Sequence, residues 1–418
     1  MSDLQAQLDD LRKRMSAAAA RADQAVVEAA RVRAAMPVIP IEEHIEGRLV
    51  ETAHGTHFEH ERLWHAQRRH GSVDISELIE LPSDWLGAIS AGELAATDVT
   101  KWAFLDTETT GLAGGSGTCA FLVGVGRITA EGFRLKQYFM RDFEDEASML
   151  TALAADLEDA ETLVTYNGKA FDVPLLETRY RMKRARTPFT WMGHLDLLFG
   201  ARRLWRLRLE SCKLTQLESQ VLGFERDGDI PGDMIPRVYF DYVRLRSPER
   251  LKPIFEHNAL DIVTLACLTA LVPRAFHDPV GEARQGARHA AEMVSLGRWL
   301  WKTERAAEAL ELFRRAIREN LRDDLMFRTL WDMAQIERRA GRFTEAAEIY
   351  TELTACGNAH RAEACIELAK HYERREKDYG RALEYCELAL SYDETPELLK
   401  RRERLVKRAG APQNQRLL

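Results

Sequence analysis

Two carboxylates lie one residue apart where an apolar strand ends at a glycine turn. Residues 103–105 are apolar, Asp106 and Glu108 follow, and Gly111 comes three residues later. Alternate residues of a strand share a face, so both carboxylates point in one direction, about 5–7 Å apart. Like charges at that separation repel each other unless a cation lies between them. Oxygen ligands without Cys or His nearby prefer Mg²⁺ or Mn²⁺ to zinc, so the stretch predicts part of a hard divalent-metal site.

Two later segments supply the rest of the predicted site. Residues 162–166 form a short apolar strand, and Asp172 follows at the junction with a helix. Residues 255–266 have a helical apolar period in which His257 and Asp261 are four apart, so both lie on one helix face. Each carboxylate alone has a plainer interpretation, because Asp172 suits a helix N-cap and Asp261 a solvated helix surface. The order in which all four carboxylates occur favours a shared site.

The number and type of these residues fit phosphodiester hydrolysis. The two-metal route needs two divalent cations about 3.5–4 Å apart, which clamp the attacking and leaving oxygens, and roughly four carboxylates to hold them. That number is supplied by Asp106, Glu108, Asp172 and Asp261. His257, one helical turn before Asp261, is placed to orient the attacking water or to accept its proton. We therefore expect two Mg²⁺ or Mn²⁺ ions as cofactors.

The three ordered motifs resemble those of the ribonuclease-H-like DEDD 3′–5′ exonucleases. The chain has an Asp-x-Glu strand, then Asn-x-x-x-Phe-Asp at 167–172, then a His before the last Asp. Within that superfamily it resembles the YprB-like group, which shares the sequence Asp-Thr-Glu-Thr-Thr-Gly-Leu and a late His-Asn-x-x-Asp motif. The resemblance covers roughly residues 45–275. One departure concerns spacing, because His257 stands four residues before Asp261, the spacing of the tyrosine branch, whereas the histidine branch places His five before.

This resemblance implies a ribonuclease-H-like fold and removal of nucleotides from the free 3′ end of DNA or RNA. It implies that the four carboxylates hold the metal ions and that His257 acts on the water. It places Leu112 where an apolar residue wedges against the terminal base. The other motif residues expected at the nucleic acid are Thr109, Asn167 and Lys169. Asp196 is not a metal ligand in the family, and we expect it to make structural hydrogen bonds at a strand end.

The formal net charge of −7 argues mildly against indiscriminate nucleic-acid binding, but the chain contains two local basic clusters. The first lies within residues 179–186 and the second within residues 202–208. A phosphate track beside an acidic centre needs such cations, because the centre alone repels a polyanion. We expect phosphate contacts from Arg181, Lys183 and Arg184, with the second cluster as the next candidate. The alternative for each cluster is an ordinary solvated helix face.

The order of elements indicates an α/β domain with a mixed five-stranded sheet and flanking helices. A hairpin-like stretch with Gly55 at its turn precedes that sheet, over residues 48–60. Five histidines lie between His54 and His70, and without any Cys beside them we interpret them as surface residues rather than as a zinc site.

From about residue 283 the pattern changes to successive helices with an internal repeat. A small residue followed four positions later by an aromatic residue or Cys recurs at Ala309 and Phe313, Ala346 and Tyr350, and Ala382 and Cys386. The repeats are spaced 37 and 36 residues apart and resemble tetratricopeptide repeats. Small residues let paired helices approach, so an all-α repeat domain that docks a protein partner is expected over residues 283–410. The alternative is an unrelated helical bundle.

Length and composition complete the domain prediction. The 418 residues favour two to three domains. Residues 1–35 are predicted to form a helical or coiled arm, residues 36–280 the exonuclease domain, and residues 283–410 the repeats. The six cysteines contain no Cys-x-x-Cys pair, and no apolar signal core or long apolar run is evident, so we expect a cytoplasmic protein without a membrane partner.

These patterns predict a metal-dependent 3′–5′ exonuclease with a helical-repeat docking domain. The alternative is a catalytically inactive nucleic-acid- or protein-binding module that keeps the ribonuclease-H-like fold. The complete set of carboxylates favours the enzyme, whereas the unusual spacing of His257 keeps the alternative open.

Overall fold

The protein is described by a computed structural model that covers residues 13–19, 21, 24, 39–82, 87, 90, 94–111, 117–284 and 289–410. It divides into two compact units, which we describe separately. Unit 1 comprises residues 1–198 and 213–270, and unit 2 comprises residues 199–212 and 271–418. Most of the arm predicted over residues 1–35, together with Leu112, lies outside the described residues.

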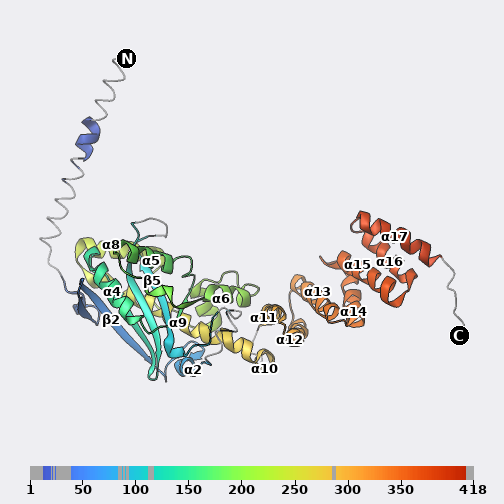
Figure 1. Ribbon diagram of the computed structural model, residues 1–418, viewed down its shortest axis with the longest axis horizontal. Coiled ribbons are helices and arrows are strands. Elements are labelled where there is room, and N and C mark those ends of the chain that lie inside the picture. Colours follow the sequence, from blue (N-terminus) through green and yellow to red (C-terminus); the bar gives the residue numbers. More distant parts are fainter. Residues whose placement is uncertain are drawn as a thin grey trace, which may run out of the picture. The chain divides into compact units, whose positions relative to one another are not determined.

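Unit 1 is built on a mixed sheet of seven strands in the order β1-β2-β7-β6-β5-β8-β9 (Figure 1). The strands are β1 (Arg48–Thr52), β2 (Gly55–His65), β5 (Trp102–Thr109), β6 (Ala120–Thr129), β7 (Gly132–Phe139), β8 (Thr162–Thr165) and β9 (Gly193–Asp196). A separate small ladder joins β3 (Arg69–His70) and β4 (Val73–Asp74). The pairs β5–β8 and β8–β9 are parallel, and all other pairs of the large sheet are antiparallel.

The sheet is larger than the predicted five strands because the β1–β2 hairpin joins it. Gly55 begins β2 with φ +111°, a conformation that glycine adopts without strain, and it closes the predicted turn. The long β2 then pairs with β7 over residues 58–65, which extends the sheet by two strands. The prediction of five strands was therefore wrong in number, whereas the mixed α/β architecture is confirmed.

Helices cover both faces of this sheet (Figure 1). The helices of unit 1 are α2 (Ile75–Ile79), α4 (Glu146–Asp156), α5 (Asp172–Met182), α7 (Leu214–Leu217), α8 (Ile235–Leu245) and most of α9 (Lys252–His277). Residues of α4, α5 and α8 form one buried cluster with β5, β6 and β7, including Leu105, Leu153, Leu176 and Tyr239. The stretch Pro248–Phe276 is long and apolar enough to cross a membrane, but 78% of its apolar window is buried, as in the core helix of a globular protein.

The helix α9 approaches the sheet where β6 carries glycine. A Cβ atom on Gly124 would lie 2.2 Å from Ile262 Cδ1 and 2.3 Å from Asn258 Oδ1. Both contacts are too short for real atoms, so only glycine allows α9 to lie this close to the strand. Gly124 also pairs with Asp106 in the ladder, and the close approach therefore brings α9 onto the carboxylate-bearing face of β5.

Unit 2 consists of helices, with α6 (Leu197–Trp205) supplying its first segment from Phe199 onward. Its other helices are α10 (Pro279–Arg284), α11 (Ala290–Lys302), α12 (Ala306–Arg318), α13 (Asp323–Arg339), α14 (Phe343–Thr354), α15 (Arg361–His371), α16 (Tyr379–Leu390) and α17 (Pro396–Ala409). The segment 199–212, which the sequence places inside the exonuclease domain, thus groups with the helical unit. An ion pair joins Arg208 to Glu292 of α11 at 2.5 Å.

The repeated sequence pattern occupies equivalent places in α12, α14 and α16. Its members are all buried: Ala309, Phe313, Ala346, Tyr350, Ala382 and Cys386. A Cβ atom on Gly297 of α11 would lie 2.4 Å from the Phe313 ring, so a small residue does permit the approach of α11 and α12. All six cysteines are free, in keeping with the absence of Cys-x-x-Cys pairs.

We predict that Gly124→Ala lowers the free energy of unfolding by about 1–3 kcal/mol, the usual cost of overpacking a tight contact. The added methyl group would push α9 away from β6. Urea unfolding followed by circular dichroism measures the effect. Gly357→Ala is the control, because a Cβ atom there meets nothing within 4 Å. Equal stability of the two variants would show that α9 does not pack on β6 as described.

Candidate active site

The first strand of the site, β5, ends with Asp106 and Glu108 half-buried on one face. Asn258 of α9 orders the first of them by donating from Nδ2 to Asp106 Oδ2 at 2.9 Å. The same amide accepts a hydrogen bond at Oδ1 from Gln137 Nε2 of β7 at 2.8 Å. Asn258 is fully buried and lies over Gly124, which has no side chain in the way. The amide of Asn258 therefore links Asp106 of β5 to β7, which lies two strands away in the same sheet.

The third carboxylate, Asp172, is delivered by the first residue of α5. Thr107, between the two carboxylates of β5, donates from Oγ1 to Asp172 Oδ1 at 2.5 Å. The loop before α5 is held by Asp196 at the end of β9, which accepts from the backbone N–H of Asn167 at 2.8 Å and of Lys169 at 3.1 Å. These bonds confirm the predicted structural role of Asp196 and fix where Asp172 lies.

The helix α9 brings His257 and Asp261 to the same place. His257 Nδ1 lies 2.8 Å from Asp229 Oδ1, and its Nε2 lies 3.6 Å from Asp261 Oδ2. With Nδ1 directed at the Asp229 carboxylate, Nε2 is the ring atom left to act as an acceptor in the neutral imidazole.

Arg226 neutralises part of this acidic centre. Its Nη2 donates to Asp261 Oδ1 at 2.5 Å, and its Nε donates to Glu218 Oε2 at 2.5 Å. Glu218 is itself buried and also accepts a hydrogen bond from Thr264. His70, interpreted from the sequence as a surface residue, is instead buried beside this group and lies 2.8 Å from Thr264 Oγ1. His57 is also buried, against Ser148 and Glu59, so the surface interpretation was wrong for two histidines.

Burial and the negative charges of their neighbours raise the pKa values of the predicted carboxylates. Burial raises the pKa of Asp106 well above its usual range, and the charges of Asp261, Asp172 and Glu108 raise it further. Burial likewise raises the pKa of Glu108 to about 8 and that of Asp172 to about 6. The pKa of Asp261 is raised by burial although Arg226 and His257 oppose the shift.

The same negative charges also raise the pKa of His257, but there burial opposes them. Burial acts to lower the pKa of His257, but the charges of Asp261 and Glu108 and the hydrogen bond to Asp229 outweigh it and raise the pKa above its usual value. Groups whose pKa values depart strongly through specific neighbours are typical of functional sites.

The carboxylate set has the chemistry of a hard-cation site, since its donors are all oxygens and their mutual repulsion favours a divalent cation. Among the described residues, however, no three His, Cys, Asp or Glu side chains stand close enough together to hold one ion as they are. Rotation of the carboxylates toward a shared cation would be required, and Asp261 would contribute its Oδ2 because Arg226 engages Oδ1.

A pocket of about 420 Å³ opens beside the carboxylates. Its lining comprises Thr107, Glu108, Thr109, Gly111, Phe171, Asp172, Leu175, Gly232, Asp233 and Pro236. Phe171 directly precedes Asp172 and is 47% exposed, although it is aromatic. An exposed aromatic ring next to carboxylates is a suitable surface for a nucleic-acid base.

The residues predicted to contact nucleic acid differ in their exposure and in their hydrogen-bond and ion-pair partners. Thr109 lines the pocket and donates from Oγ1 to the carbonyl of Gly111 at 2.9 Å. Asn167 has φ +67° in the loop held by Asp196, and the Lys169 side chain is exposed. Arg181 in the last turn of α5 and Arg184 after it are exposed, whereas Lys183 pairs with Glu146 at 3.0 Å. Glu146 also accepts two hydrogen bonds from Arg179, so two cations of the first basic cluster are already neutralised.

Several contributors lie outside the sequence prediction: Thr107, Glu218, Arg226, Asp229 and Asn258. Asn258 had a usable signal, because it is the second residue of the late His-Asn-x-x-Asp motif, directly after His257 and three residues before Asp261. Arg226 and Asp229 come from an irregular segment with no periodic pattern, so only the tertiary structure reveals them.

Comparison with known proteins identifies similar sequences. Residues 103–272 match a family model described as RNase_H superfamily, and this range contains all four carboxylates and His257. The chain is also 32% identical over 327 residues to the uncharacterized protein YprB of Bacillus subtilis (strain 168), an alignment that spans 77% of this chain and 78% of YprB.

We predict that in EDTA the thermal midpoint falls as pH rises from 5 to 8. The folded protein keeps the proton of Asp172 up to a pKa of about 6 and that of Glu108 up to a pKa of about 8, while the unfolded chain has already released both, near 3.8 and 4.5. The native state binds more protons, so its stability decreases with increasing pH. Differential scanning fluorimetry measures this slope.

Asp106→Asn should flatten that slope, because it removes one member of the repelling set. Glu158→Gln, a change at an exposed residue, should behave like the wild type. A midpoint that rises between pH 5 and 8 in the wild type would contradict the assignment of raised carboxylate pKa values.

Proposed function

The chain belongs to the RNase_H superfamily and to the family of YprB, and from this we propose that it is a metal-dependent 3′–5′ exonuclease acting on DNA or RNA. The nuclease-type fold is the established part of this statement. The exonuclease polarity, the metal dependence and the substrate are the parts we propose.

The observation that carries the proposal is the convergence of carboxylates from three separate segments. Asp106 and Glu108 come from β5, Asp172 from the start of α5, and Asp261 from α9. The charges of the other three all raise the pKa of Asp106. A folded protein keeps such mutual repulsion at a cost in stability, and sites of this kind are usually functional.

Members of this superfamily typically use divalent metals, and the oxygen donors fit Mg²⁺ or Mn²⁺. Bound there, two such ions would stabilise the charge on the attacking and leaving oxygens of the phosphodiester. The residues that would hold them are Asp106, Glu108, Asp172 and Asp261. Asn258 and Thr107 keep two of these carboxylates in place through hydrogen bonds of 2.9 and 2.5 Å.

His257 is the proposed proton acceptor. In the proposed tautomer, Nδ1–H donates a hydrogen bond to Asp229 Oδ1 and thereby fixes the ring, which leaves Nε2, 3.6 Å from Asp261 Oδ2, to take a proton from the attacking water. The raised pKa of His257 means that it accepts this proton readily and must start unprotonated, so activity should rise with pH through that pKa.

The pocket beside the carboxylates is the proposed binding place of the 3′-terminal nucleotide. Phe171 offers its exposed ring for stacking on a base, an interaction that does not depend on sequence. Leu175 and Pro236 supply further apolar surface in the same pocket.

A second candidate function is an inactive nucleic-acid-binding module. Arg226 favours this alternative because its guanidinium group occupies Asp261 Oδ1, which would otherwise be available to a cation. We favour the enzyme because Asp106, Glu108 and Asp172 have no such cationic partner among the described ion pairs.

The helical unit is proposed to be a tetratricopeptide-like repeat stack that docks a partner, and the protein is proposed to act in the cytoplasm. The repeat assignment is supported by the buried small and aromatic residues at equivalent places in α12, α14 and α16.

The first test is hydrolysis of end-labelled single-stranded DNA and RNA. With Mg²⁺ or Mn²⁺ the wild type should shorten 5′-labelled strands one nucleotide at a time, and EDTA should stop the reaction. Asp106→Ala should abolish turnover without lowering the thermal midpoint in EDTA, because a repelling charge is removed. Glu158→Gln serves as the matched control and should keep full activity. Wild-type turnover in Asp106→Ala would refute the proposed centre.

A second prediction concerns the proton acceptor. His257→Ala should lower kcat by roughly 10²–10⁴-fold, the usual contribution of a general base, and should remove the basic rise from the pH–rate profile. His257→Tyr should keep part of the activity, because the tyrosine branch has Tyr at this spacing. If both variants follow the wild-type profile between pH 6 and 9, His257 has no part in proton transfer.

A further inference from the structure

A cleft of about 380 Å³ in unit 2 is lined largely by cations. It is formed by residues after the start of α6, by α11 and by α13. The lining consists of Arg202, Arg203, Arg206, Leu207, Ser295, Arg298, Trp299, Lys302 and Arg328. Six of these nine residues are basic and none is acidic, so the cleft concentrates positive charge.

Most of these cations make no ion pair with a carboxylate among the residues that the structure describes. Arg298 pairs through Nε with Asp332 at 2.6 Å, but its Nη2 is buried and has no hydrogen-bond partner. Arg203 lies over the ring of Trp299 at 5.2 Å and makes no ion pair with a described carboxylate. Lys302 and Arg328, which are both exposed, likewise make no ion pair with a described carboxylate. An orphaned buried donor among repelling cations calls for an anionic acceptor.

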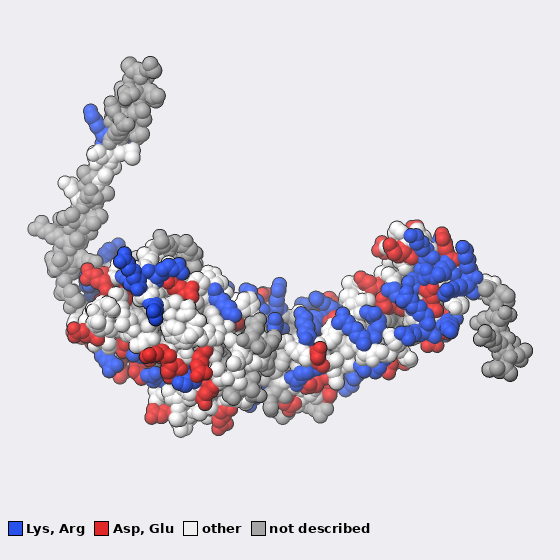
Figure 2. Space-filling view, in the orientation of Figure 1, with Lys and Arg blue, Asp and Glu red and all other residues white. Residues whose placement is uncertain are grey.

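The formal net charges of the two units also place the excess of positive charge in unit 2. Unit 2 contains 31 Lys and Arg against 26 Asp and Glu, a formal net charge of +5. Unit 1 contains 28 against 40, a net charge of −12. Figure 2 shows Lys and Arg side chains gathered over the last helices of unit 2. A polyanion would therefore be attracted by unit 2 and repelled by unit 1 outside its metal centre.

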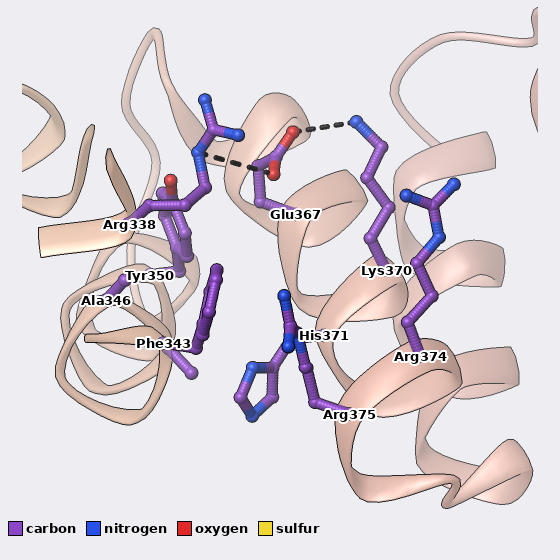
Figure 3. Close-up of a pocket in the computed structure, with 10 residues that line it drawn as sticks. Arg338, Phe343, Ala346, Tyr350, Glu367, Lys370, His371, Arg374 and Arg375 are labelled. Carbon is purple, nitrogen blue, oxygen red and sulfur yellow. Dashed lines mark hydrogen bonds and ion pairs between the residues drawn. The ribbon is translucent and has the colours of Figure 1, made fainter. Parts of the chain in front are cut away.

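Some other basic groups of the chain are already paired with carboxylates. In unit 1, Glu146 already neutralises Arg179 and Lys183. A second cation-rich pocket of unit 2 contains a carboxylate of its own, because Glu367 pairs with Lys370 at 2.7 Å and faces Arg338 (Figure 3). The cleft between α6 and α11 has no lining carboxylate and is the stronger site for an anion.

We propose that this cleft binds the backbone phosphates of a nucleic-acid strand, which makes the helical unit a substrate-holding element as well as a docking domain. Five of its six cations are arginines, whose planar forks match phosphate oxygens and carry the charge at any physiological pH. Contacts of this kind read no sequence. The identity of the bound strand as substrate rests on the proposed exonuclease function.

The test replaces one cation from each of the three helical segments in the full-length protein: Arg202→Glu, Lys302→Glu and Arg328→Glu. The matched control is Lys400→Glu, Arg402→Glu and Lys407→Glu on α17, which changes the net charge equally at exposed positions. Fluorescence anisotropy with labelled 30-nucleotide DNA and RNA of two sequences gives Kd in EDTA, where no hydrolysis occurs. Measurements at several KCl concentrations give the salt dependence.

The cleft variant should bind all four strands about tenfold or more weakly. Its log Kd should also depend less steeply on log salt, with a slope smaller by about 2, because each phosphate that a cation no longer neutralises lowers the slope by roughly 0.7. The control, whose cations lie on the exposed basic surface of α17, should weaken binding several-fold less than the cleft variant does. Equal weakening in both variants, or none in the cleft variant, would overturn the proposal. So would a labelled poly-glutamate peptide that binds the wild type as tightly as the strands do and fails to bind the cleft variant.

Hydrolysis separates this proposal from the proposed function. A wild type that binds through the cleft but degrades nothing with Mg²⁺ or Mn²⁺ would refute the exonuclease and leave the cleft assignment standing. A cleft variant that still degrades a short oligonucleotide at saturation, but has a weakened affinity for the 30-mers, would support both. A preference of the wild type for DNA or for RNA identifies which backbone the cleft holds.

Discussion

The whole site depends on one buried amide that crosses the sheet above a glycine. Asn258 joins Asp106 of β5 to Gln137 of β7, and it reaches both because Gly124 on the intervening strand has no side chain. This amide sets the rotation of α9 about its own axis. His257 precedes it and Asp261 follows three residues later, so the same contact orients the base and the last carboxylate. A loss of packing at Gly124 would therefore displace His257 and Asp261, although Gly124 itself contacts no reacting group.

The charges of the site are arranged unevenly. Arg226 bridges Glu218 and Asp261 and carries the positive charge on one side of α9. Asp106, Glu108 and Asp172 have no comparable cation among the described ion pairs, and burial, together with neighbouring negative charges, raises their pKa values. The negative potential is thus concentrated on the β5 side of the site. A divalent cation would be drawn to that side, while Arg226 offsets part of the charge of Asp261.

Local sequence patterns were sufficient for much of this site, because its residues sit on regular strands and helices. The strand period placed Asp106 and Glu108 on one face, and the helix period placed His257 and Asp261 on another. Asp196 was recognised as structural because the family resemblance gave it no metal. Arg226 and Asp229 could not be predicted, since they come from an irregular segment and their partners are distant in the sequence.

The fold was predicted less completely than the site, for a related reason. The hairpin of β1 and β2 was visible in the sequence, but its pairing with β7 depends on hydrogen bonds between residues about 80 positions apart, as for Phe58 and Phe139. The second basic cluster was recognised as a possible phosphate track, yet its grouping with the helical unit was not. That grouping rests on contacts such as Arg208 with Glu292, which no local pattern encodes.

The division of unit 2 into two chain segments has a consequence for synthesis on the ribosome. Arg208 lies 84 residues before Glu292, so the segment 199–212 is made well before its partner helix exists. At about 5–20 residues per second this delay lasts on the order of 4–17 s. During that time the ion pair between Arg208 and Glu292 cannot form. The grouping of segment 199–212 with the helical unit can therefore be completed only after α11 has emerged.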